Sequence, residues 1–429
     1  MSKKYIVVLI DGASDYPLTE LGSKTPLQVA NKPVIDELAR HGVVGMVKTI
    51  PEGVVPGSDS ANLSILGYDP RIYSTGRSSL EAVSMGIELS EEDVTFRCNL
   101  VTLSDECSYP KKIMLDYSAG EITTGEAKIL INDIAQEFQT DRIRFYAGIS
   151  YRHIIVWRDG IGEVDDAILL TPPHDISGRQ IANYLPKGKN SSIFLDFMLK
   201  SEGILKEHTV NTARIKGGKN PANSIWIWAK ATKPALDSFY EKYRIKGSVI
   251  SAVDLVKGIG ICAGLKPVDV KGATGNIHTD FEGKARAALK ELESGQDFVY
   301  IHIEAPDECG HQGDFKEKIR AIELIDAKVI KILKEELDSL KTDYSMLILP
   351  DHPTPIIKKT HTSDPVPFLI YDSKDCGTAE TAAGTRTVTG KGAGAQNSSN
   401  IYDEFYPQTT GLFISEGHKL MDYFLSKKD

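Results

Sequence analysis

Aspartate and histidine residues gather near the ends of two predicted strands in the last third of the chain. The runs 298–303 and 346–349 are short and mostly apolar, which is typical of strands buried in a sheet. Three polar segments, 305–311, 350–352 and 359–361, follow these runs or lie nearby. Their candidate metal ligands are Asp307, His311, Asp351, His352 and His361. Because one ion is commonly held by three or four side chains, this set exceeds the needs of a single metal.

Asp11 and Ser58 extend the set toward two divalent metals with a hydroxyl between them. Asp11 ends the apolar run 5–10, and open α/β sheets place ligands at that end of a strand. Ser58 follows a glycine in a loop before a predicted helix, where free backbone N–H groups favour phosphate oxygens. Ligands of this kind, without thiolates, suit zinc, manganese or similar ions. Since two such ions can clamp a phosphoryl group, the chemistry indicated is phosphoryl transfer.

Ser58 is the predicted nucleophile, because a hydroxyl beside a metal has a lowered pKa. Ser60 from the same loop is the competing candidate, and a plain helix N-cap is the structural alternative for Ser58. Asp307 and His311 are four residues apart, a spacing that puts both on one face of a helix. His302 lies within a predicted strand, so we interpret it as a core histidine or one that supports a ligand.

A phosphorylated substrate also needs cations and a general acid or base. Arginine suits bidentate contacts with phosphate or carboxylate groups. Asp175 is a candidate general base, and Lys257, at the start of a predicted helix, is a candidate catalytic cation. The candidate substrate-binding residues are Arg152, His153, Asp175, Arg214 and Lys257.

The first and last parts of the chain predict an α/β fold. The run 5–10 reads as a strand buried on both faces, and 25–40 as one amphipathic helix that begins with Pro26 and stops at Gly42. A second helix is expected after the loop 57–60. Further predicted helices are 252–263, 281–293 and 316–337. This alternation favours a central, mostly parallel sheet flanked by helices.

The middle of the chain has a different pattern. It predicts a strand at 94–101, a helix at 124–138, a strand pair within 142–157, a helix at 191–206 and a strand at 224–230. The order β-α-β-β-α-β is typical of a ferredoxin-like α+β unit. We therefore predict a metal-binding catalytic domain of residues 1–87 and 246–429, interrupted by an inserted substrate-closing domain of residues 88–245. A length of 429 residues also favours two domains.

The composition, 41% hydrophobic and 25% charged, is typical of a soluble globular protein. A net charge of -9 argues against nucleic-acid binding. Neither a long apolar run nor a signal-peptide pattern at the N-terminus is present, so we expect no membrane span and a cytoplasmic enzyme. The stretch 378–400, rich in Gly, Ala, Thr and Ser, reads as a surface loop without an assigned function.

Taken together, these motifs resemble the cofactor-independent phosphoglycerate mutases, most closely their archaeal-type branch, within the alkaline phosphatase superfamily. The resemblance covers nearly the whole chain and keeps the family's order. The matching segments are 8–12, 25–30, 57–63, 254–260, 272–275, 305–311, 350–352 and His361. The metal motifs are specific to the superfamily, whereas Gly-Ser-Asp-Ser-Ala-Asn at 57–62 and Lys-Gly-Ile-Gly at 257–260 are specific to the mutases.

The resemblance implies an alkaline-phosphatase-like core with an inserted smaller α+β domain. It also implies an isomerase that interconverts 3-phosphoglycerate and 2-phosphoglycerate in glycolysis and gluconeogenesis, without 2,3-bisphosphoglycerate. Ser58 would carry the phosphoryl group of this small phosphorylated carboxylate. Two divalent metals are implied, manganese first, with zinc, cobalt or magnesium as alternatives. One metal would be held by Asp307, His311 and His361. The other would be held by Asp11, Ser58, Asp351 and His352.

Other functions remain open from the residues alone. A phosphatase of the same superfamily would share every metal ligand, and another phosphomutase would share the nucleophile too. A non-catalytic metal-binding protein is the distant alternative. A sulfatase is disfavoured, because it needs Cys-x-Pro-x-Arg where this chain has Gly-Ser-Asp-Ser at 57–60. The inserted domain favours transfer over hydrolysis, since an enclosed intermediate is shielded from water. The sequence does not indicate the oligomeric state.

Overall fold

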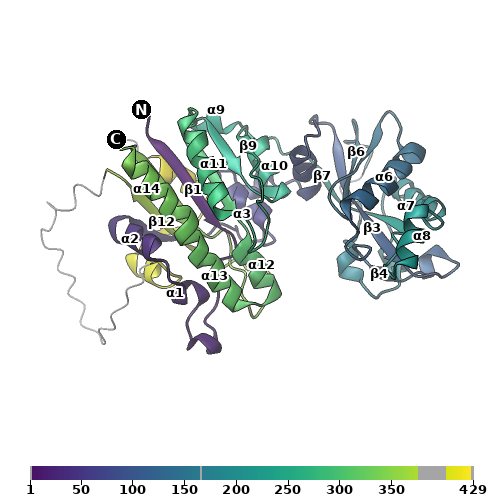
Figure 1. Ribbon diagram of the computed structural model, residues 1–429. Coiled ribbons are helices and arrows are strands. Elements are labelled where there is room, and N and C mark those ends of the chain that lie inside the picture. The colour runs from purple at the N-terminus through teal and green to yellow at the C-terminus, as the bar shows by residue number, and fades with distance from the viewer. Residues whose placement is uncertain (1, 165–166, 375–401, 427–429) are drawn as a thin grey trace, which may run out of the picture. The chain divides into compact units, whose positions relative to one another are not determined.

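The computed structural model describes residues 2–164, 167–374 and 402–426, and the predicted loop 378–400 lies outside these ranges. The chain divides into two compact units (Figure 1). The larger unit comprises Met1–Ser74 and Leu236–Asp429, and the smaller unit comprises Thr75–Ala235. The smaller unit is thus an insertion between two halves of the larger one.

The larger unit is built on a mostly parallel sheet (Figure 1). Its strands, in spatial order, are β13 (Phe413–Ile414), β2 (Val43–Val47), β12 (Val366–Asp372), β11 (Tyr344–Leu349), β1 (Lys4–Ile10), β10 (Phe298–Ile303), β8 (Gly247–Ile250) and β9 (Lys266–Val268). The strands from β11 to β9 are parallel, whereas β12 is antiparallel to both of its neighbours. Every residue of β1 is buried, as a central strand requires. The predicted α/β class is confirmed.

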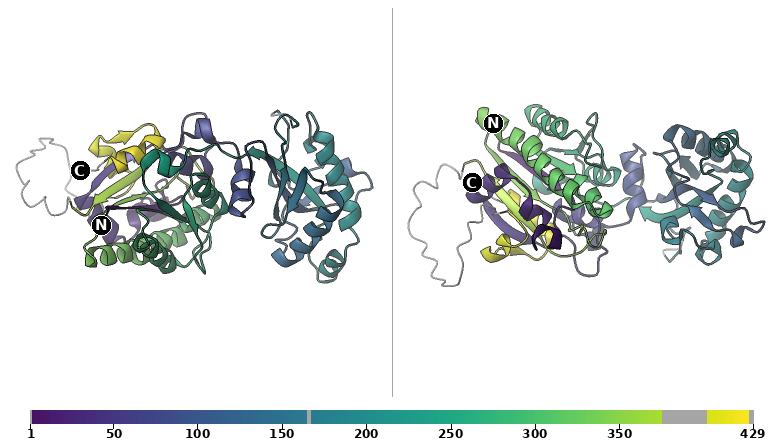
Figure 2. Two further views of the ribbon diagram at one scale, coloured as in Figure 1. Left: turned by 90° about the horizontal axis from the view of Figure 1, so that it is seen from above. Right: turned by 60° about the horizontal axis from the view of Figure 1, so that its bottom comes forward.

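Helices cover both faces of this sheet (Figure 2). One face carries α1 (Pro26–Val29), α2 (Pro33–His41), α11 (Phe281–Glu293), α13 (Phe315–Ile325) and α14 (Lys331–Ser339), the last two joined by a π-helical turn, Asp326–Ile330. The other face carries α3 (Ser58–Ile65), α9 (Phe239–Tyr243), α10 (Asp254–Cys262) and α15 (Leu420–Leu425). There the ring of Tyr5 contacts Phe424, and that of Phe298 contacts Phe239. The remaining helices are α4 (Pro70–Tyr73) and α12 (Ala305–Gln312).

The predicted helix 25–40 is wrong in one respect, since two helices occupy this stretch. Thr25 caps α1 through a reciprocal pair of hydrogen bonds with Gln28, and Pro26 occupies the first turn as predicted. The helix ends at Val29, and α2 begins at Pro33. A proline in the interior of a helix lacks the N–H donor and clashes with the preceding turn. Pro33 therefore starts a helix and cannot continue one.

The smaller unit has the predicted β-α-β-β-α-β order. Its elements are α5 (Arg77–Ser84), β3 (Val94–Leu103), β4 (Met114–Asp116), α6 (Thr124–Phe138), β5 (Ile143–Tyr146), β6 (Arg152–Trp157), α7 (Ser191–Leu205), α8 (Thr209–Lys216) and β7 (Ser224–Thr232). The antiparallel order β7-β3-β6-β5 is that of a ferredoxin-like sheet, and β4 pairs with the end of β3. The helices α6 and α7 pack on one face of it over the unit's own hydrophobic core.

The structure moves both predicted domain boundaries, from 88 to 75 and from 245 to 235. Helix α5 belongs to the smaller unit, because Ser78 hydrogen-bonds Thr95 at 2.8 Å and Glu81 pairs with Arg97. Helix α9 belongs to the larger unit, because the ring centroids of Phe239 and Phe298 lie 4.5 Å apart. The pattern of predicted strands marked where the insertion's sheet begins and ends, and missed the flanking helices.

A buried ion pair ties together the loops that follow β1 and β11. Lys318 of α13 donates its three N–H groups to Asp15 Oδ2 at 2.7 Å, to the Thr354 carbonyl oxygen at 2.8 Å and to the Ser14 carbonyl oxygen at 3.3 Å. The side chains of Lys318 and Asp15 are fully buried. Since Asp11 and Asp351 begin these two loops, the pair also fixes the edge of the sheet where the candidate ligands lie.

The variant Lys318→Met is expected to lower the free energy of unfolding by about 3 kcal/mol, because it leaves the Asp15 carboxylate buried without its cation. Urea unfolding followed by circular dichroism measures this loss. Lys316→Met, on the exposed side of the same helix, is the matched control and is expected to change stability by less than about 0.5 kcal/mol. Equal midpoints for the two variants would contradict a structural role for the pair.

Candidate active site

The parallel strands bring the six predicted Asp and His ligands to one edge of the larger unit's sheet. Asp11 directly follows β1, Asp351 and His352 follow β11, and α12, which carries Asp307, follows β10. Because the carboxyl ends of parallel strands meet at one edge, residues about 300 positions apart become neighbours. Among the described residues, three groups have ligand atoms within 4.8 Å of one another. They are Asp307–His311–His361, Asp11–Asp307–His352 and Asp11–His302–Asp351.

The first group converges on Asp307. His311 Nε2 lies 3.3 Å from Asp307 Oδ2, and His361 Nε2 lies 3.5 Å from Asp307 Oδ1. The two imidazole Nε2 atoms are 2.9 Å apart, so both rings point at the same place. His311 Nδ1 donates to the Lys359 carbonyl oxygen at 3.0 Å, which leaves Nε2 as the ligand atom. The four-residue spacing in α12 places Asp307 and His311 on one face, as predicted.

The second part of the cluster is more deeply buried and includes Ser58. His352 Nε2 lies 3.7 Å from Asp11 Oδ1 and 3.4 Å from Asp351 Oδ2, and all three side chains are at most 1% exposed. Ser58 Oγ lies 3.1 Å from His352 Nε2. The structure thus places the predicted nucleophile against this half of the cluster.

Ser58 is the first residue of α3, and Ser60, two residues further on, makes different contacts. Ser60 is buried, and its hydroxyl donates to the carbonyl oxygens of Gly57 at 3.0 Å and Val55 at 3.2 Å. Its hydroxyl is therefore occupied in bracing the loop. The Ser58 hydroxyl contacts the imidazole of a candidate ligand, so the geometry favours Ser58 over its competitor as the nucleophile.

Negative charge is crowded at this edge of the sheet. Burial, followed by the charges of Asp351 and Asp307, raises the pKa of Asp11 well above its ordinary value. Burial and the charge of Asp307 also raise the pKa of Glu304 to about 8. Within the described part of the chain, Asp11 Oδ1 is buried without a hydrogen-bond partner. An orphaned carboxylate oxygen beside convergent imidazoles fits a divalent cation, whose charge would offset this crowding.

Three further residues support the ligands, and two of them, Thr354 and Asn62, were given no role by the sequence. His302 Nε2 hydrogen-bonds Asp11 Oδ2 at 2.8 Å, which agrees with its interpretation as a histidine that supports a ligand. Thr354 donates to Asp307 Oδ1 and lies 3.3 Å from His352 Nδ1. Asn62 Nδ2 donates to Asp351 Oδ2 at 3.1 Å. Their only sequence signal is closeness to a ligand or nucleophile in the chain, as for Thr354, two residues after His352.

Four of the predicted substrate residues lie in the smaller unit, where they differ in exposure. Arg152 is exposed and stacks over the Tyr151 ring at 5.6 Å, and Asp175 is exposed with its carboxylate 3.6 Å from His174. His153 is 2% exposed, accepts a hydrogen bond from the Gly148 N–H, and burial lowers its pKa to about 3. It is therefore a core residue that cannot reach a substrate from where it stands.

The remaining two predicted substrate residues, Arg214 and Lys257, each form an ion pair with a carboxylate of their own unit. Arg214 is 3% exposed and donates to Glu126 at 2.8 Å, to Asn220 and to Ala119, so it braces the smaller unit. Lys257, in α10 of the larger unit, pairs with Asp269. Surface arginines and structural arginines look the same in a single sequence, which explains the choice of Arg214.

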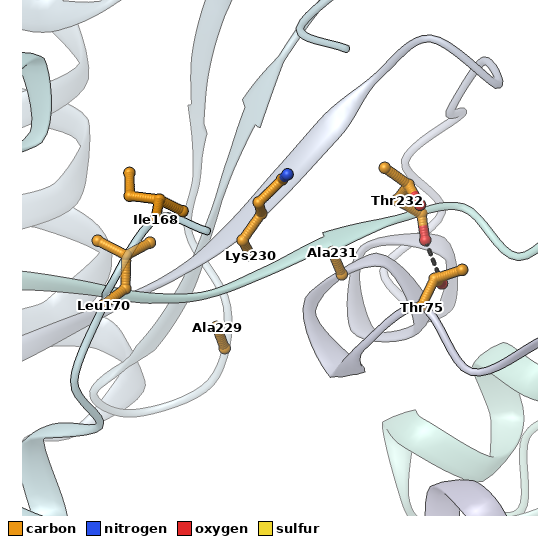
Figure 3. Close-up of a pocket in the computed structure, with 7 residues that line it drawn as sticks. All are labelled: Thr75, Ile168, Leu170, Ala229, Lys230, Ala231 and Thr232. Carbon is orange, nitrogen blue, oxygen red and sulfur yellow. Dashed lines mark hydrogen bonds between the residues drawn. The ribbon is translucent and has the colours of Figure 1, made fainter. Parts of the chain in front are cut away.

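A cavity of about 370 Å³ lies in the smaller unit along β7 (Figure 3). It is lined by Thr75, Ile168, Leu170, Ala229, Lys230, Ala231 and Thr232. Figure 3 shows Lys230 beside alanine and threonine side chains, with Thr75 hydrogen-bonded to Thr232. The lining contains no carboxylate and no imidazole among the described residues, so it does not offer the metal ligands found at the edge of the larger sheet.

Comparisons with known proteins show which family this chain resembles. A family model described as 2,3-bisphosphoglycerate-independent phosphoglycerate mutase matches residues 39–211. A Geobacter sulfurreducens protein called a probable 2,3-bisphosphoglycerate-independent phosphoglycerate mutase is 46% identical over 99% of this chain and 100% of its own length. The Methanosarcina acetivorans protein of that name is 49% identical over 86% of this chain and 90% of its own.

Solved structures agree as well. A Pyrococcus horikoshii protein is 27% identical, with a TM-score of 0.77 over 99% of this chain and 97% of that one. The cofactor-independent phosphoglycerate mutase of Thermoplasma acidophilum is 25% identical, with a TM-score of 0.63 over 99% of both chains. The similarity therefore extends across both units of the chain.

A mostly parallel sheet with an Asp/His cluster and a serine at its carboxyl edge is the arrangement of a phosphoryl-transfer enzyme. The chain belongs to the 2,3-bisphosphoglycerate-independent phosphoglycerate mutase family, whose members are isomerases. The resemblance inferred from the motifs is confirmed. Within the described ranges, no helix has the length and apolar character needed to cross a bilayer.

Proposed function

We propose that this chain interconverts 3-phosphoglycerate and 2-phosphoglycerate without 2,3-bisphosphoglycerate, with Ser58 as the residue that carries the phosphoryl group. The observation that supports it most directly is the 3.1 Å contact between Ser58 Oγ and His352 Nε2 inside the Asp/His cluster. The 46% identity, over 99% of this chain, to a protein named as a probable mutase of this kind supports the choice of substrate. We place the reaction in glycolysis and gluconeogenesis and the enzyme in the cytoplasm.

Two divalent metals complete this proposal, with manganese first and zinc, cobalt or magnesium as alternatives. One would be held by Asp307, His311 and His361. The other would be held by Asp11, Ser58, Asp351 and His352. When bound, such ions neutralise phosphoryl oxygens and lower the pKa of the serine hydroxyl. The orphaned Asp11 Oδ1 and the convergent Nε2 atoms of His311 and His361 are the observations that support a metal at these positions.

The reaction divides into two transfers. Ser58 Oγ attacks phosphorus, so that a bond from Oγ to phosphorus forms while the bond from phosphorus to the O3 of the substrate breaks. The serine proton is transferred in net terms to O3, which gives glycerate and a phosphoserine. The O2 hydroxyl then attacks phosphorus, so that a bond from O2 to phosphorus forms while the bond from Oγ to phosphorus breaks. Asp175 is our candidate base for the O2 proton, which passes in net terms to Ser58 Oγ. Ser58 regains its proton at the end, so no atom is lost.

Of the predicted substrate residues, the three that are not buried, Arg152, Asp175 and Lys257, are retained in this proposal. Arg152 supplies a bidentate donor for a carboxylate or phosphate. Lys257 supplies a cation in the larger unit, and it would exchange its Asp269 partner for the substrate. His153 and Arg214 are assigned structural roles, because both are buried. The smaller unit would close over the substrate, since water at the phosphoserine would make the enzyme a phosphatase.

The test is a product assay with 3-phosphoglycerate that follows 2-phosphoglycerate and inorganic phosphate together. A mutase forms 2-phosphoglycerate with little phosphate. A phosphatase, which would use the same ligands, releases phosphate in proportion to substrate lost. Another phosphomutase would leave 3-phosphoglycerate unchanged and act on a different phosphate ester. Either of the last two results would overturn the proposed substrate reaction.

Removing metal is expected to lower the rate of this interconversion by more than about 100-fold, because the buried carboxylates of Asp11, Asp307 and Asp351 then face the incoming phosphate. The measurement compares protein dialysed against a chelator with the same protein after manganese is added back. Parallel additions of zinc, cobalt and magnesium rank the metals. Full activity after verified metal removal would be incompatible with the proposed metal sites.

A further inference from the structure

Asn62 and Tyr300 link the helix of Ser58 to a candidate metal ligand across the larger unit. Asn62 lies one turn after Ser58 in α3, and Tyr300 lies in the middle of β10; both side chains are fully buried. Asn62 Nδ2 donates to the Ser58 carbonyl oxygen at 2.8 Å and to Asp351 Oδ2 at 3.1 Å. The Tyr300 hydroxyl donates to Asn62 Oδ1 at 2.7 Å. Three elements thus meet at one amide.

The contacts allow this amide a single orientation. A carbonyl oxygen and a carboxylate oxygen can only accept, so the Asn62 NH2 group must face Ser58 and Asp351. Its Oδ1 then faces Tyr300, which must be the donor. Burial raises the pKa of Tyr300 well above its ordinary value, so the phenol keeps its proton at any working pH. Tyr300 therefore prevents the amide from turning over.

The same amide completes the hydrogen bonds that orient Asp351. Its Oδ1 accepts the backbone N–H groups of Gly12 at 3.1 Å and His352 at 2.9 Å. Its Oδ2 accepts Asn62 Nδ2 and lies 3.4 Å from His352 Nε2. Both carboxylate oxygens of Asp351 are therefore hydrogen-bonded. The Asn62 amide, which binds Oδ2, also hydrogen-bonds the backbone of Ser58, the residue that carries the nucleophile.

We propose that Asn62 and Tyr300 are positioning residues that fix Ser58 relative to the Asp351 carboxylate. Asn62 holds the two together, and Tyr300 acts through Asn62, since it contacts the amide and not the serine hydroxyl. This role rests on the proposed function, because the alignment of Ser58 matters to catalysis only if Ser58 accepts a phosphoryl group. Small displacements of a nucleophile from its line of attack cost large factors in rate.

The first test is Tyr300→Phe, which removes one hydroxyl and leaves the ring. We expect kcat to fall by about tenfold with KM changed by less than about twofold, because the substrate contacts are intact while the nucleophile is loosened. Single-turnover formation of phosphoserine is expected to slow by the same factor. Asn62→Asp, which sets a carboxylate against Asp351, is expected to lower kcat by about 100-fold and to change the manganese dissociation constant.

Tyr68→Phe is the matched control. Tyr68 is also a buried tyrosine of the larger unit, and its hydroxyl donates to the Asp237 carbonyl oxygen at 2.8 Å. Tyr68→Phe should lower stability about as much as Tyr300→Phe does, as measured by thermal unfolding, and should leave kcat unchanged. An equal fall in kcat for both variants, or an unchanged kcat for Tyr300→Phe, would refute the positioning role.

The wild-type assay separates this inference from the proposed function. If the wild type forms phosphoserine and interconverts the two phosphoglycerates while Tyr300→Phe and Asn62→Asp retain wild-type kcat, the positioning role fails and the function stands. If the wild type forms no phosphoserine, both fail together.

Discussion

Replacing Ser58 by alanine is expected to abolish the interconversion of 3-phosphoglycerate and 2-phosphoglycerate, with kcat lowered by at least about 10,000-fold. The reason is chemical. Both transfers pass through the Ser58 oxygen, and alanine offers no atom to accept phosphorus. The measurement is the product assay combined with mass spectrometry of the protein after brief exposure to substrate. The wild type should gain a phosphoryl group at Ser58, and the variant should gain none.

Ser60→Ala provides the control for this experiment, since it removes the same atom two residues away. The Ser60 hydroxyl is hydrogen-bonded to backbone carbonyl oxygens of its own loop. We therefore expect Ser60→Ala to lower the free energy of unfolding by about 1 kcal/mol and kcat by less than about tenfold. Loss of phosphorylation in Ser60→Ala with retention in Ser58→Ala would assign the nucleophile to Ser60. Normal turnover in both variants would exclude a phosphoserine intermediate in this loop.

The candidate ligands could be found in the sequence because their positions follow from strand patterns. Short apolar runs ended by aspartate mark the carboxyl ends of parallel strands, and such ends meet at one edge of a sheet. Asp11 and Asp351 needed nothing more than that rule. The pair Asp307–His311 added a helical spacing. His361 depended on its nearness to Asp351 in the chain, and the structure places it in the same cluster.

The rest of the site depends on contacts that have no period in the sequence. Tyr300 and Asn62 are 238 residues apart, and their contact depends on how α3 packs on β10. A buried tyrosine in a strand looks like any other core residue until its hydroxyl partner is known. The same limit affected Arg214, whose type suggested an anion site while its three partners show a structural brace.

The domain boundaries failed for a related reason. A strand pattern identifies a sheet, but a flanking helix such as α5 joins whichever unit its side chains contact. The ion pair between Glu81 and Arg97 and the hydrogen bond between Ser78 and Thr95 decide that membership. Neither pair can be read from local sequence, because each joins a helix to a strand that follows a loop.

Replacing Asp307 by asparagine is expected to lower kcat/KM by at least about 100-fold, because this carboxylate is shared by two of the ligand groups. Its oxygens face His311 Nε2 and His361 Nε2, and asparagine keeps the size while losing the charge and one acceptor. The variant should bind about one equivalent of manganese fewer than the wild type, measured by elemental analysis after gel filtration.

Thermal unfolding with and without manganese separates loss of a ligand from loss of structure. A metal that binds only the folded state raises its stability by an amount set by concentration and affinity, so a weakened site must show a smaller gain. Asp36→Asn is the control, because Asp36 is a buried aspartate that pairs with Lys32 at 3.1 Å, outside the cluster. Asp36→Asn should lower stability equally with and without manganese, and should keep the full gain in stability on adding manganese.

Gly12 also constrains the position of Asp307, since a Cβ atom at position 12 would lie 2.6 Å from Asp307 Oδ1. The lack of a side chain at position 12 therefore leaves room for the Asp307 carboxylate beside Asp11. If Asp307→Asn retains the wild-type gain in stability with manganese, that close approach serves packing and the assignment of Asp307 as a ligand is wrong.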